Sequence, residues 1–221
     1  MTDIFSALAD SPGEVNFYFL RHGKSEGNDK DIVQGHLDFP LSSEGREQAG
    51  RTGAWFADKN IRTLLCSPLS RAAQTAAIVA EEAGLPKPRQ LESLREMNTG
   101  AYTGLTLEEA REKYPDMWPR FQAASWEGVE GAEKIESLRE RSTAVLAALV
   151  KEVAGYSGKA GILAVSHAGF LQWIIKSICG GTSWFPLFPM GHCGVYQLSV
   201  NGPIVRWSLL NFQVLGVTGK R

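Results

Sequence analysis

The sequence predicts an α/β fold: a three-layer sandwich with a mostly parallel central sheet, helices on both faces and a small helical cap insertion. Three observations lead to this prediction. Short apolar segments typical of buried strands alternate with longer segments that carry helix caps. Such alternation is typical of parallel strands joined by helices, which then cover both faces of the sheet. Near the end of the chain, two apolar segments flank Asn201-Gly202, a pair that favours a tight antiparallel hairpin.

The predicted strands are short and mostly apolar, and polar or glycine residues follow several of them. In chain order they cover residues 16–20, 63–66, 91–94, 161–165, 195–200 and 204–210. The first strand is strongly apolar and aromatic, which is typical of a buried position. A polar loop is expected after it, over residues 25–43.

The predicted helices are marked by residues that favour helix ends. Ser43 is the expected N-cap of the first helix. Gly84 closes an alanine-rich helix, and Thr106 forms a capping box with Glu109. The expected helices cover residues 44–58, 70–83, 107 to about 114, 136–153 and 169–179.

Length and composition fit one ordinary globular domain. The 221 residues can bury a large core without disulfides or metals, and 43% of them are apolar while 21% are charged. We therefore expect residues 1–221 to form a single domain, with the cap insertion over about residues 98–135. The net charge of −1 gives no overall attraction to nucleic acid or to an anionic membrane, so neither is an expected partner.

Cysteine usage and the lack of long apolar runs indicate a reducing, cytoplasmic setting. Cys66, Cys179 and Cys193 have spacings that suit neither a zinc site nor a disulfide framework. No apolar run is long enough to span a membrane. The N-terminus carries acidic residues and no basic region before a long apolar stretch, so no signal peptide is expected.

Polar residues with related chemistry stand where the predicted strands end. Open α/β sheets bind their ligands outside the carboxyl ends of the strands. The segments at these ends are Arg21-His22-Gly23, Ser67-Pro68-Leu69-Ser70-Arg71, Arg95-Glu96 and Ser166-His167-Ala168-Gly169. Each segment alone also fits an ordinary surface turn, an exposed arginine or carboxylate, or a hydrogen-bonded loop histidine.

Taken together, the segments offer the groups that phosphoryl transfer through a histidine requires. These groups are cations that hold the phosphate, a nucleophile, and a proton donor for the leaving oxygen. Arg71 is expected in the first turn of a helix, where free backbone N–H groups and the helix dipole favour an anion. Gly169 lets a substrate approach the backbone near His167.

These segments resemble the motifs of the histidine phosphatase superfamily, also called phosphoglycerate mutase-like. The resemblance covers about residues 15–210, in the order of the family. It extends to Gln34-Gly35 through Asp38, Pro40-Leu41-Ser42 to Gly45, Gln48-Ala49, and Gly100 to Gly104 around Tyr102.

The resemblance implies a role for each polar residue. His22 would attack phosphorus and form a phosphohistidine, and Glu96 would protonate the leaving group and then activate water. Charge in the transition state would be stabilised by Arg21, Arg71 and His167. The substrate phosphate would be bound by Arg21, Asn28, Gln34, Gly35, Arg71 and His167. Because arginines supply the positive charge, neither a metal nor another cofactor is expected.

The favoured function is a phosphatase that hydrolyses small phosphorylated metabolites. Phosphoryl transfer of the phosphoglycerate mutase type is the alternative within the family. Dedicated mutases are longer and carry extra loop segments, for which this chain lacks room. A mutase must also keep its phosphohistidine from water, which demands a closed pocket. A homodimer through an edge contact of the hairpin strands stays open.

Two functions of other classes remain as alternatives. A cysteine-dependent phosphatase would use Cys66 and Arg71, but that chemistry needs five residues between them, and here four intervene and include Pro68. A non-catalytic module that binds phosphorylated ligands is the other. Family members that lose catalysis usually lose a core residue, whereas the nucleophile, the acid and the second histidine are all present here.

Some residues near the motifs leave the substrate pocket undefined. Lys24 stands where Glu or Gln is frequent in the family, and Gly27 stands where many mutases carry an aromatic residue. His36 is a candidate for substrate contact, and His192 is expected to be structural or exposed. One or two aromatic residues of the cap insertion are candidates for the leaving-group pocket, from the set Tyr102, Tyr114, Trp118, Phe121 and Trp126.

Overall fold

A mixed six-stranded sheet forms the centre of the molecule. The computed structural model describes residues 13–153, 156 and 158–215. The strands are β1 (Val15–Arg21), β2 (Ile61–Cys66), β3 (Arg89–Gln90), β4 (Ala160–Ser166), β5 (Val195–Asn201) and β6 (Ile204–Phe212). Their order in the sheet is β3-β2-β4-β1-β5-β6, in which the first four are parallel and the last two antiparallel. The predicted parallel sheet with a terminal hairpin is therefore confirmed.

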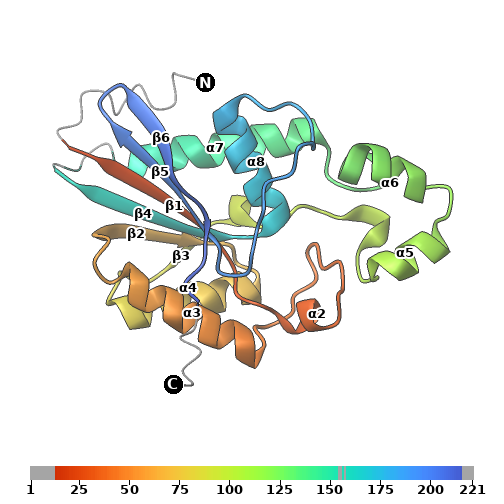
Figure 1. The fold of residues 1–221 in the computed structure, drawn as a ribbon, viewed down its shortest axis with the longest axis horizontal. Coiled ribbons are helices and arrows are strands. Elements are labelled where there is room, and N and C mark those ends of the chain that lie inside the picture. The colour runs from red at the N-terminus through yellow and green to blue at the C-terminus, as the bar shows by residue number, and fades with distance from the viewer. Residues whose placement is uncertain (1–12, 154–155, 157, 216–221) are drawn as a thin grey trace.

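Helices cover both faces of this sheet, as predicted (Figure 1). One face is covered by α3 (Ser43–Phe56) and α4 (Ser70–Ala83), and the other by α7 (Ile135–Val153) and α8 (Ala168–Cys179). Successive side chains of a strand point to opposite faces. Accordingly, Phe17 and Phe19 of β1 belong to the core under α7 and α8, while Tyr18 and Leu20 belong to the core under α3 and α4.

A third apolar cluster lies in the segment that precedes α7, residues 98–134, which we call the cap. Figure 1 shows the cap beside one end of the sandwich. Its elements are η2 (Gly100–Tyr102), α5 (Leu107–Lys113), α6 (Trp118–Ala124) and η3 (Ser125–Gly128). Tyr102 is fully buried at its centre, where its ring contacts Tyr114, Phe121 and Trp126.

Several predicted element ends are confirmed. Gly84 caps α4 in the left-handed conformation with φ 63°. Thr106 and Glu109 form both hydrogen bonds of the capping box at the start of α5. The turn between β5 and β6 contains Gly202, whose φ of 56° is readily adopted by glycine.

Three local predictions are wrong. Residues 91–94 do not form a strand: β3 ends at Gln90, and η1 (Glu92–Leu94) is a single 3-10 turn that buries Leu94. The N-cap of α3 is Ser42 rather than Ser43, because the Ser42 hydroxyl accepts the Gly45 N–H. The polar loop 25–43 contains a short helix, α2 (Glu26–Asp29), held by a capping box between Ser25 and Asn28.

None of the helices in the described part of the chain is long and apolar enough to cross a membrane. The N-terminal residues 1–12, on which the expectation about a signal peptide rests, lie outside the described residues.

Candidate active site

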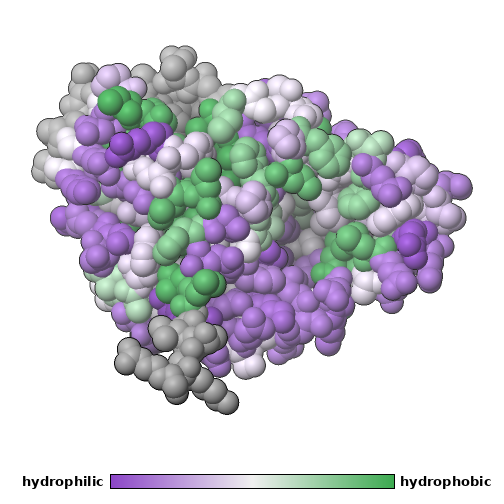
Figure 2. All heavy atoms as spheres, viewed as in Figure 1, coloured by the Kyte–Doolittle hydropathy of each residue, from purple (hydrophilic) through white to green (hydrophobic). Residues whose placement is uncertain are grey.

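The predicted site residues converge on one cavity at the carboxyl ends of β1 and β4. The cavity has a volume of about 320 Å³ and lies between the sheet and the cap, where Figure 2 shows a hollow in the surface. Seven of the predicted residues line it: Arg21, His22, Asn28, Gln34, Gly35, Arg71 and Glu96. His167 is fully buried and does not line the cavity, but its ring centroid lies 5.1 Å from that of His22.

His22 is a buried, neutral imidazole with one defined tautomer. Its Nδ1 lies 2.7 Å from the carbonyl oxygen of Gly23, and because a carbonyl only accepts, Nδ1 carries the proton. The lone pair therefore resides on Nε2. Burial, followed by the charges of Arg21 and Arg71, holds the pKa of His22 well below its usual range. A neutral imidazole is the form that can act as a nucleophile.

Arg21 is held by the segment that precedes β5. One terminal nitrogen donates to the carbonyl of Met190, and the other lies 3.0 Å from Nε2 of His192. Since an arginine nitrogen only donates, Nε2 of His192 accepts this hydrogen bond. Burial lowers the pKa of Arg21 to about 10, which still leaves the guanidinium charged at neutral pH. His192, expected to be structural or exposed, is thus a partner of a site arginine.

Arg71 lies in the first turn of α4 and is almost fully buried. Its two terminal nitrogens each donate over 2.8 Å, to the carbonyls of Leu37 and Gly35. Gly35 has a positive φ of 49°, and a Cβ there would lie 2.4 Å from the Thr99 hydroxyl. The loop can therefore bring its carbonyl to Arg71 only with glycine at this position.

Buried polar atoms without a partner gather at this site. Among the described residues, they include Nε of Arg21, Nε of Arg71 and Nδ1 of His167. The other ring nitrogen of His167 lies 2.8 Å from the Ser67 hydroxyl. Burial, and then the charge of Arg71, holds the pKa of His167 well below its usual range. Two guanidinium groups with unsatisfied N–H donors suit an anionic ligand.

Glu96 has its carboxylate at the N-terminus of α8. The carboxylate accepts backbone N–H groups of Met97 at 2.9 Å, Phe170 at 2.8 Å and Gly169 at 3.2 Å. These donors, and the positive end of the helix dipole, fix the carboxyl group at the cavity wall. A Cβ at Gly169 would lie 2.7 Å from Glu96 Oε1, so glycine permits this close approach.

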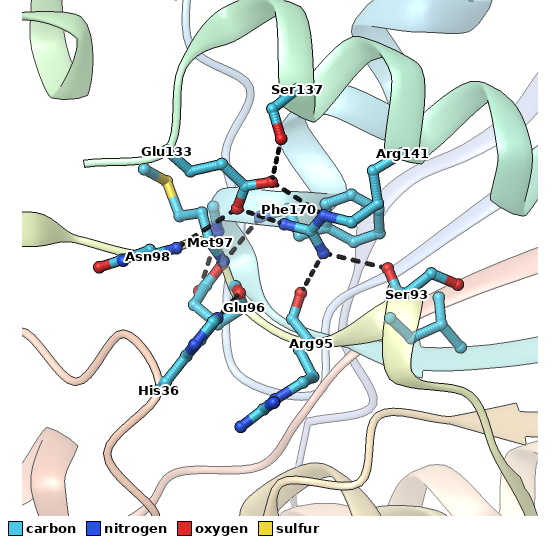
Figure 3. Close-up of polar contacts among 12 residues, drawn as sticks. His36, Ser93, Arg95, Glu96, Met97, Asn98, Glu133, Ser137, Arg141 and Phe170 are labelled. Carbon is cyan, nitrogen blue, oxygen red and sulfur yellow. Dashed lines mark hydrogen bonds and ion pairs between the residues drawn. The ribbon is translucent and has the colours of Figure 1, made fainter. Parts of the chain in front are cut away.

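Arg141 of α7 braces the segment that carries Glu96, as Figure 3 shows. It donates to the carbonyls of Ser93 at 3.0 Å and Arg95 at 2.7 Å, and its guanidinium lies 3.8 Å from the ring centroid of Phe170. Glu133 pairs with the same guanidinium. Sequence reasoning missed this support, because an arginine on a helix in a sequence gives no sign of which distant carbonyls it contacts.

The polar residues on the loop after β1 form hydrogen bonds mainly with one another. The Ser25 hydroxyl donates to Gln34 Oε1 over 3.0 Å, and Asn28 closes the capping box of α2. Gly27 is buried here, and a Cβ on it would lie 2.7 Å from Gln34 and 2.8 Å from Phe39. An aromatic side chain at position 27 would need the space that these two side chains occupy.

Two other residues singled out in the sequence lie outside the cavity lining. Lys24 forms ion pairs with Asp29 at 2.8 Å and Glu44 at 2.9 Å, which raise its pKa. His36 donates from Nε2 to the backbone carbonyl of Glu96 over 2.7 Å. Neither side chain lines the cavity, so neither is placed to contact a substrate held there.

The described residues contain no group of three or more His, Cys, Asp or Glu side chains arranged to hold a metal ion. Cys66 belongs to the core under α3 and α4, and burial raises the pKa of its thiol to about 11. A buried thiol that stays protonated at neutral pH is a poor nucleophile, which argues against a cysteine-dependent phosphatase.

Known proteins share both this sequence pattern and this fold. The model of the histidine phosphatase superfamily (branch 1) matches residues 17–213. An uncharacterized phosphatase of Bacillus subtilis, PhoE, is 30% identical over 163 residues, which make up 73% of this chain and 76% of the relative. A probable phosphoglycerate mutase of Salmonella choleraesuis, GpmB, is 27% identical over 171 residues, or 77% of each chain.

The solved structure of a mycobacterial hydrolase matches with a TM-score of 0.80 at 26% identity, and the match covers 90% of this chain and 99% of that one. The structural match therefore covers almost the whole of a solved fold, and the family model covers the segments that carry the motifs. The chain belongs to the histidine phosphatase superfamily, whose members are phosphatases and phosphoglycerate mutase-like enzymes.

Proposed function

We propose that the protein hydrolyses small phosphomonoesters through a phosphohistidine on Nε2 of His22. The observation that carries this proposal is the hydrogen bond from His22 Nδ1 to the Gly23 carbonyl, which leaves the Nε2 lone pair free. The low pKa of His22 keeps that lone pair unprotonated at neutral pH. His22 also lines a cavity that holds Arg21 and Arg71, the cations that a phosphoryl group requires.

In the first step, Nε2 of His22 attacks phosphorus and the bond from phosphorus to the ester oxygen breaks. Arg21 and Arg71, which line the cavity, stabilise the charge on the non-bridging oxygens, and His167 supplies its unpartnered Nδ1 from beside His22. Glu96 gives its proton to the leaving oxygen, so the alcohol departs neutral. The products of this step are the free alcohol, a phosphohistidine and a Glu96 carboxylate.

In the second step, the Glu96 carboxylate takes a proton from water, and the resulting oxygen nucleophile attacks the phosphohistidine. The bond from phosphorus to Nε2 breaks, inorganic phosphate leaves, and both side chains return to their starting states. Asn28, Gln34 and Gly35 line the same cavity and complete the proposed phosphate site.

Hydrolysis is favoured over mutase chemistry because the cavity opens to the surface. Figure 2 shows the hollow between the main body and the cap. A mutase must shield its phosphohistidine from water until a second substrate arrives.

The test is a chemical quench of the enzyme during turnover of ³²P-labelled phosphomonoester. The labelled protein should be unstable in acid and stable in base, as expected for a phosphohistidine, and His22→Ala should abolish the label. Label that persists in His22→Ala would refute the assignment. Binding of inorganic phosphate without turnover of any ester would instead favour a non-catalytic binding module.

We also propose a cytoplasmic setting and a homodimer, each supported by another part of the chain. Cys66, Cys179 and Cys193 are free thiols, which supports a reducing, cytoplasmic location. The edge strand β6 exposes Ile204 and Leu210, which are 60% and 61% exposed, and this supports an edge contact in a homodimer. Light scattering tests the dimer: Leu210→Lys should convert it to monomer, and a monomeric unmodified protein contradicts it.

A further inference from the structure

Charged and apolar side chains both line the cavity. Among the described residues, the charged ones are Arg21, Arg71 and Glu96. The bulky apolar ones are Phe121 and Trp126 of the cap and Trp184 and Leu187 of the loop after α8, which we call the apolar end; uncharged polar residues such as Thr99 and Gln172 complete the wall. Figure 2 shows apolar residues above the hollow and on its cap side, and hydrophilic residues along its lower edge.

We infer that the substrate is the phosphate ester of an uncharged, largely apolar alcohol, with an aromatic or alkyl group that fills the apolar end. This inference rests on the proposed function, because it assumes that the phosphate binds beside His22. The leaving group then points toward the aromatic wall, where burial of apolar surface contributes to binding.

Among the described residues that line the cavity, Arg21 and Arg71 are the only cations. Each of their terminal nitrogens donates one hydrogen bond within the protein: Arg21 to the Met190 carbonyl and His192, and Arg71 to the carbonyls of Leu37 and Gly35. We assign their remaining N–H donors to the substrate phosphate beside His22. A carboxylate on the leaving group would therefore lie against aromatic rings without a cationic partner, which is unfavourable for a buried charge.

The cap side of the apolar wall is built by an unusual backbone turn. Ser125 lies between Phe121 and Trp126 with φ 53° and ψ −140°, a conformation that residues other than glycine rarely adopt. Ser125 lies where α6 ends and η3 begins. The ring centroids of Phe121 and Trp126 lie 5.2 Å apart beside this turn. Such strain persists only where the surroundings hold it, and here both aromatic residues line the cavity.

The opposite side of the wall is fixed to α8. The Gln172 amide donates to the Phe188 carbonyl at 2.6 Å and accepts the Phe188 N–H at 2.9 Å. Lys176 donates to the carbonyl of Pro186 at 2.6 Å. These contacts hold the loop that carries Trp184 and Leu187, so the apolar end exists before a substrate binds.

The experiment compares phosphate esters that share an alkyl ester oxygen but differ in the charge of the alcohol. Phosphate release from benzyl phosphate and hexyl phosphate is measured against release from 3-phosphoglycerate and O-phosphoserine, with nitrophenyl phosphate as a reference. We expect kcat/KM to be at least about tenfold higher for the two uncharged alcohols. Equal or higher kcat/KM for the charged alcohols would overturn the inference.

Leu187→Lys places a cation at the rim of the apolar end. Leu187 is 54% exposed, so the substitution should leave the fold intact. The ratio of kcat/KM for benzyl phosphate to that for 3-phosphoglycerate should fall severalfold in this variant. Leu107→Lys is the matched control, since Leu107 is 42% exposed on the cap and does not line the cavity. An unchanged ratio in Leu187→Lys, or an equal fall in Leu107→Lys, contradicts the inference.

The two proposals fail in different ways. If the unmodified protein releases phosphate from no ester, including nitrophenyl phosphate, the proposed function is refuted. If it hydrolyses nitrophenyl phosphate but prefers charged alcohols, the function stands and the inference about the leaving group is refuted.

Discussion

Arg141 and Glu133 form a two-point ion pair beside the segment that carries Glu96. Nε of Arg141 lies 3.0 Å from Oε1 of Glu133, and Nη2 lies 2.7 Å from Oε2. The remaining nitrogen, Nη1, reaches the backbone carbonyls at positions 93 and 95. Both side chains are largely shielded, with 19% and 14% of their surfaces exposed. The pair therefore links α7 to the start of the segment that holds the proposed acid, and we regard Arg141 as a positioning residue.

Arg141→Met should lower kcat by about tenfold to a hundredfold for alkyl phosphates, because a small displacement of Glu96 impairs proton transfer. KM should change little, since Arg141 does not line the cavity. The loss should be smaller for nitrophenyl phosphate, whose leaving group needs less help from an acid. Steady-state kinetics with both substrates measures the difference.

Arg139→Met is the matched control for this variant. Arg139 lies two residues earlier on α7 and is exposed, so its replacement should leave both substrates unaffected. A loss that is equal for alkyl and nitrophenyl phosphates in Arg141→Met would indicate a general structural defect rather than displacement of the acid.

Replacement of Glu96 itself should reduce kcat for alkyl phosphates more than Arg141→Met does, and again more than for nitrophenyl phosphate. Glu96→Gln keeps the size of the side chain but cannot transfer the proton, so alkyl phosphates should slow by about 100-fold or more. Nitrophenyl phosphate should slow less, because nitrophenolate leaves without protonation. Equal slowing of both substrates would count against Glu96 as the general acid.

The site residues that stand at strand ends could be predicted because parallel strands bring their carboxyl ends to one edge of a sheet. Arg21 and Ser166 illustrate this, since they are paired in register on β1 and β4. The contact between Arg21 and His192 could not be predicted, because it joins residues 171 positions apart through side-chain geometry. The same holds for Arg141, whose partners depend on how α7 packs on the sheet.

The fold was predictable where local chemistry and burial agree. Gly84 marks the end of α4 because it adopts the left-handed conformation at the point where the amphipathic pattern stops. Residues 91–94, Leu-Glu-Ser-Leu, do not form the expected strand, because only the two ends of this segment are apolar. Here Leu91 and Leu94 are three residues apart, which matches the one turn that η1 forms.

Gly169→Ala should impair catalysis through Glu96. The added Cβ would lie 2.7 Å from Glu96 Oε1 and 3.0 Å from Met97 Cγ, so the carboxylate must shift. We expect kcat to fall by about tenfold or more, which a displacement of about 1 Å can cause. Gly50→Ala is the control, because a Cβ on Gly50 meets nothing within 4 Å.

In the middle of α3, Gly50→Ala should leave kcat unchanged and raise the free energy of unfolding by about 0.5–1 kcal/mol. Urea denaturation of both variants separates stability from catalysis. If Gly169→Ala retains full kcat for alkyl phosphates, the close approach of Gly169 to Glu96 has no catalytic importance.

The stability of the protein should decrease on acidification because its buried histidines resist protonation. Burial, followed by the charges of Arg21 and Lys24, lowers the pKa of His192 from 6.5 to about 4. Between these two values the unfolded chain binds a proton that the folded chain does not. The free energy of unfolding therefore rises with pH across this window and falls as the pH drops below 6.5. The pKa values of His22 and His167 are also lowered, so these two residues likewise make the free energy of unfolding fall as the pH drops.

His192→Asn tests the contribution of one of these groups. Asparagine can still accept a hydrogen bond from Arg21 but does not titrate, so the urea midpoint should fall less between about pH 7.5 and about pH 5 than in the unmodified protein. The reference is the unmodified protein, whose urea midpoint is followed over the same pH range. A His192→Asn variant with the pH dependence of the unmodified protein would show that protonation of His192 is not opposed by folding. That result would contradict the assignment of His192 as a neutral ring whose Nε2 accepts a hydrogen bond from Arg21.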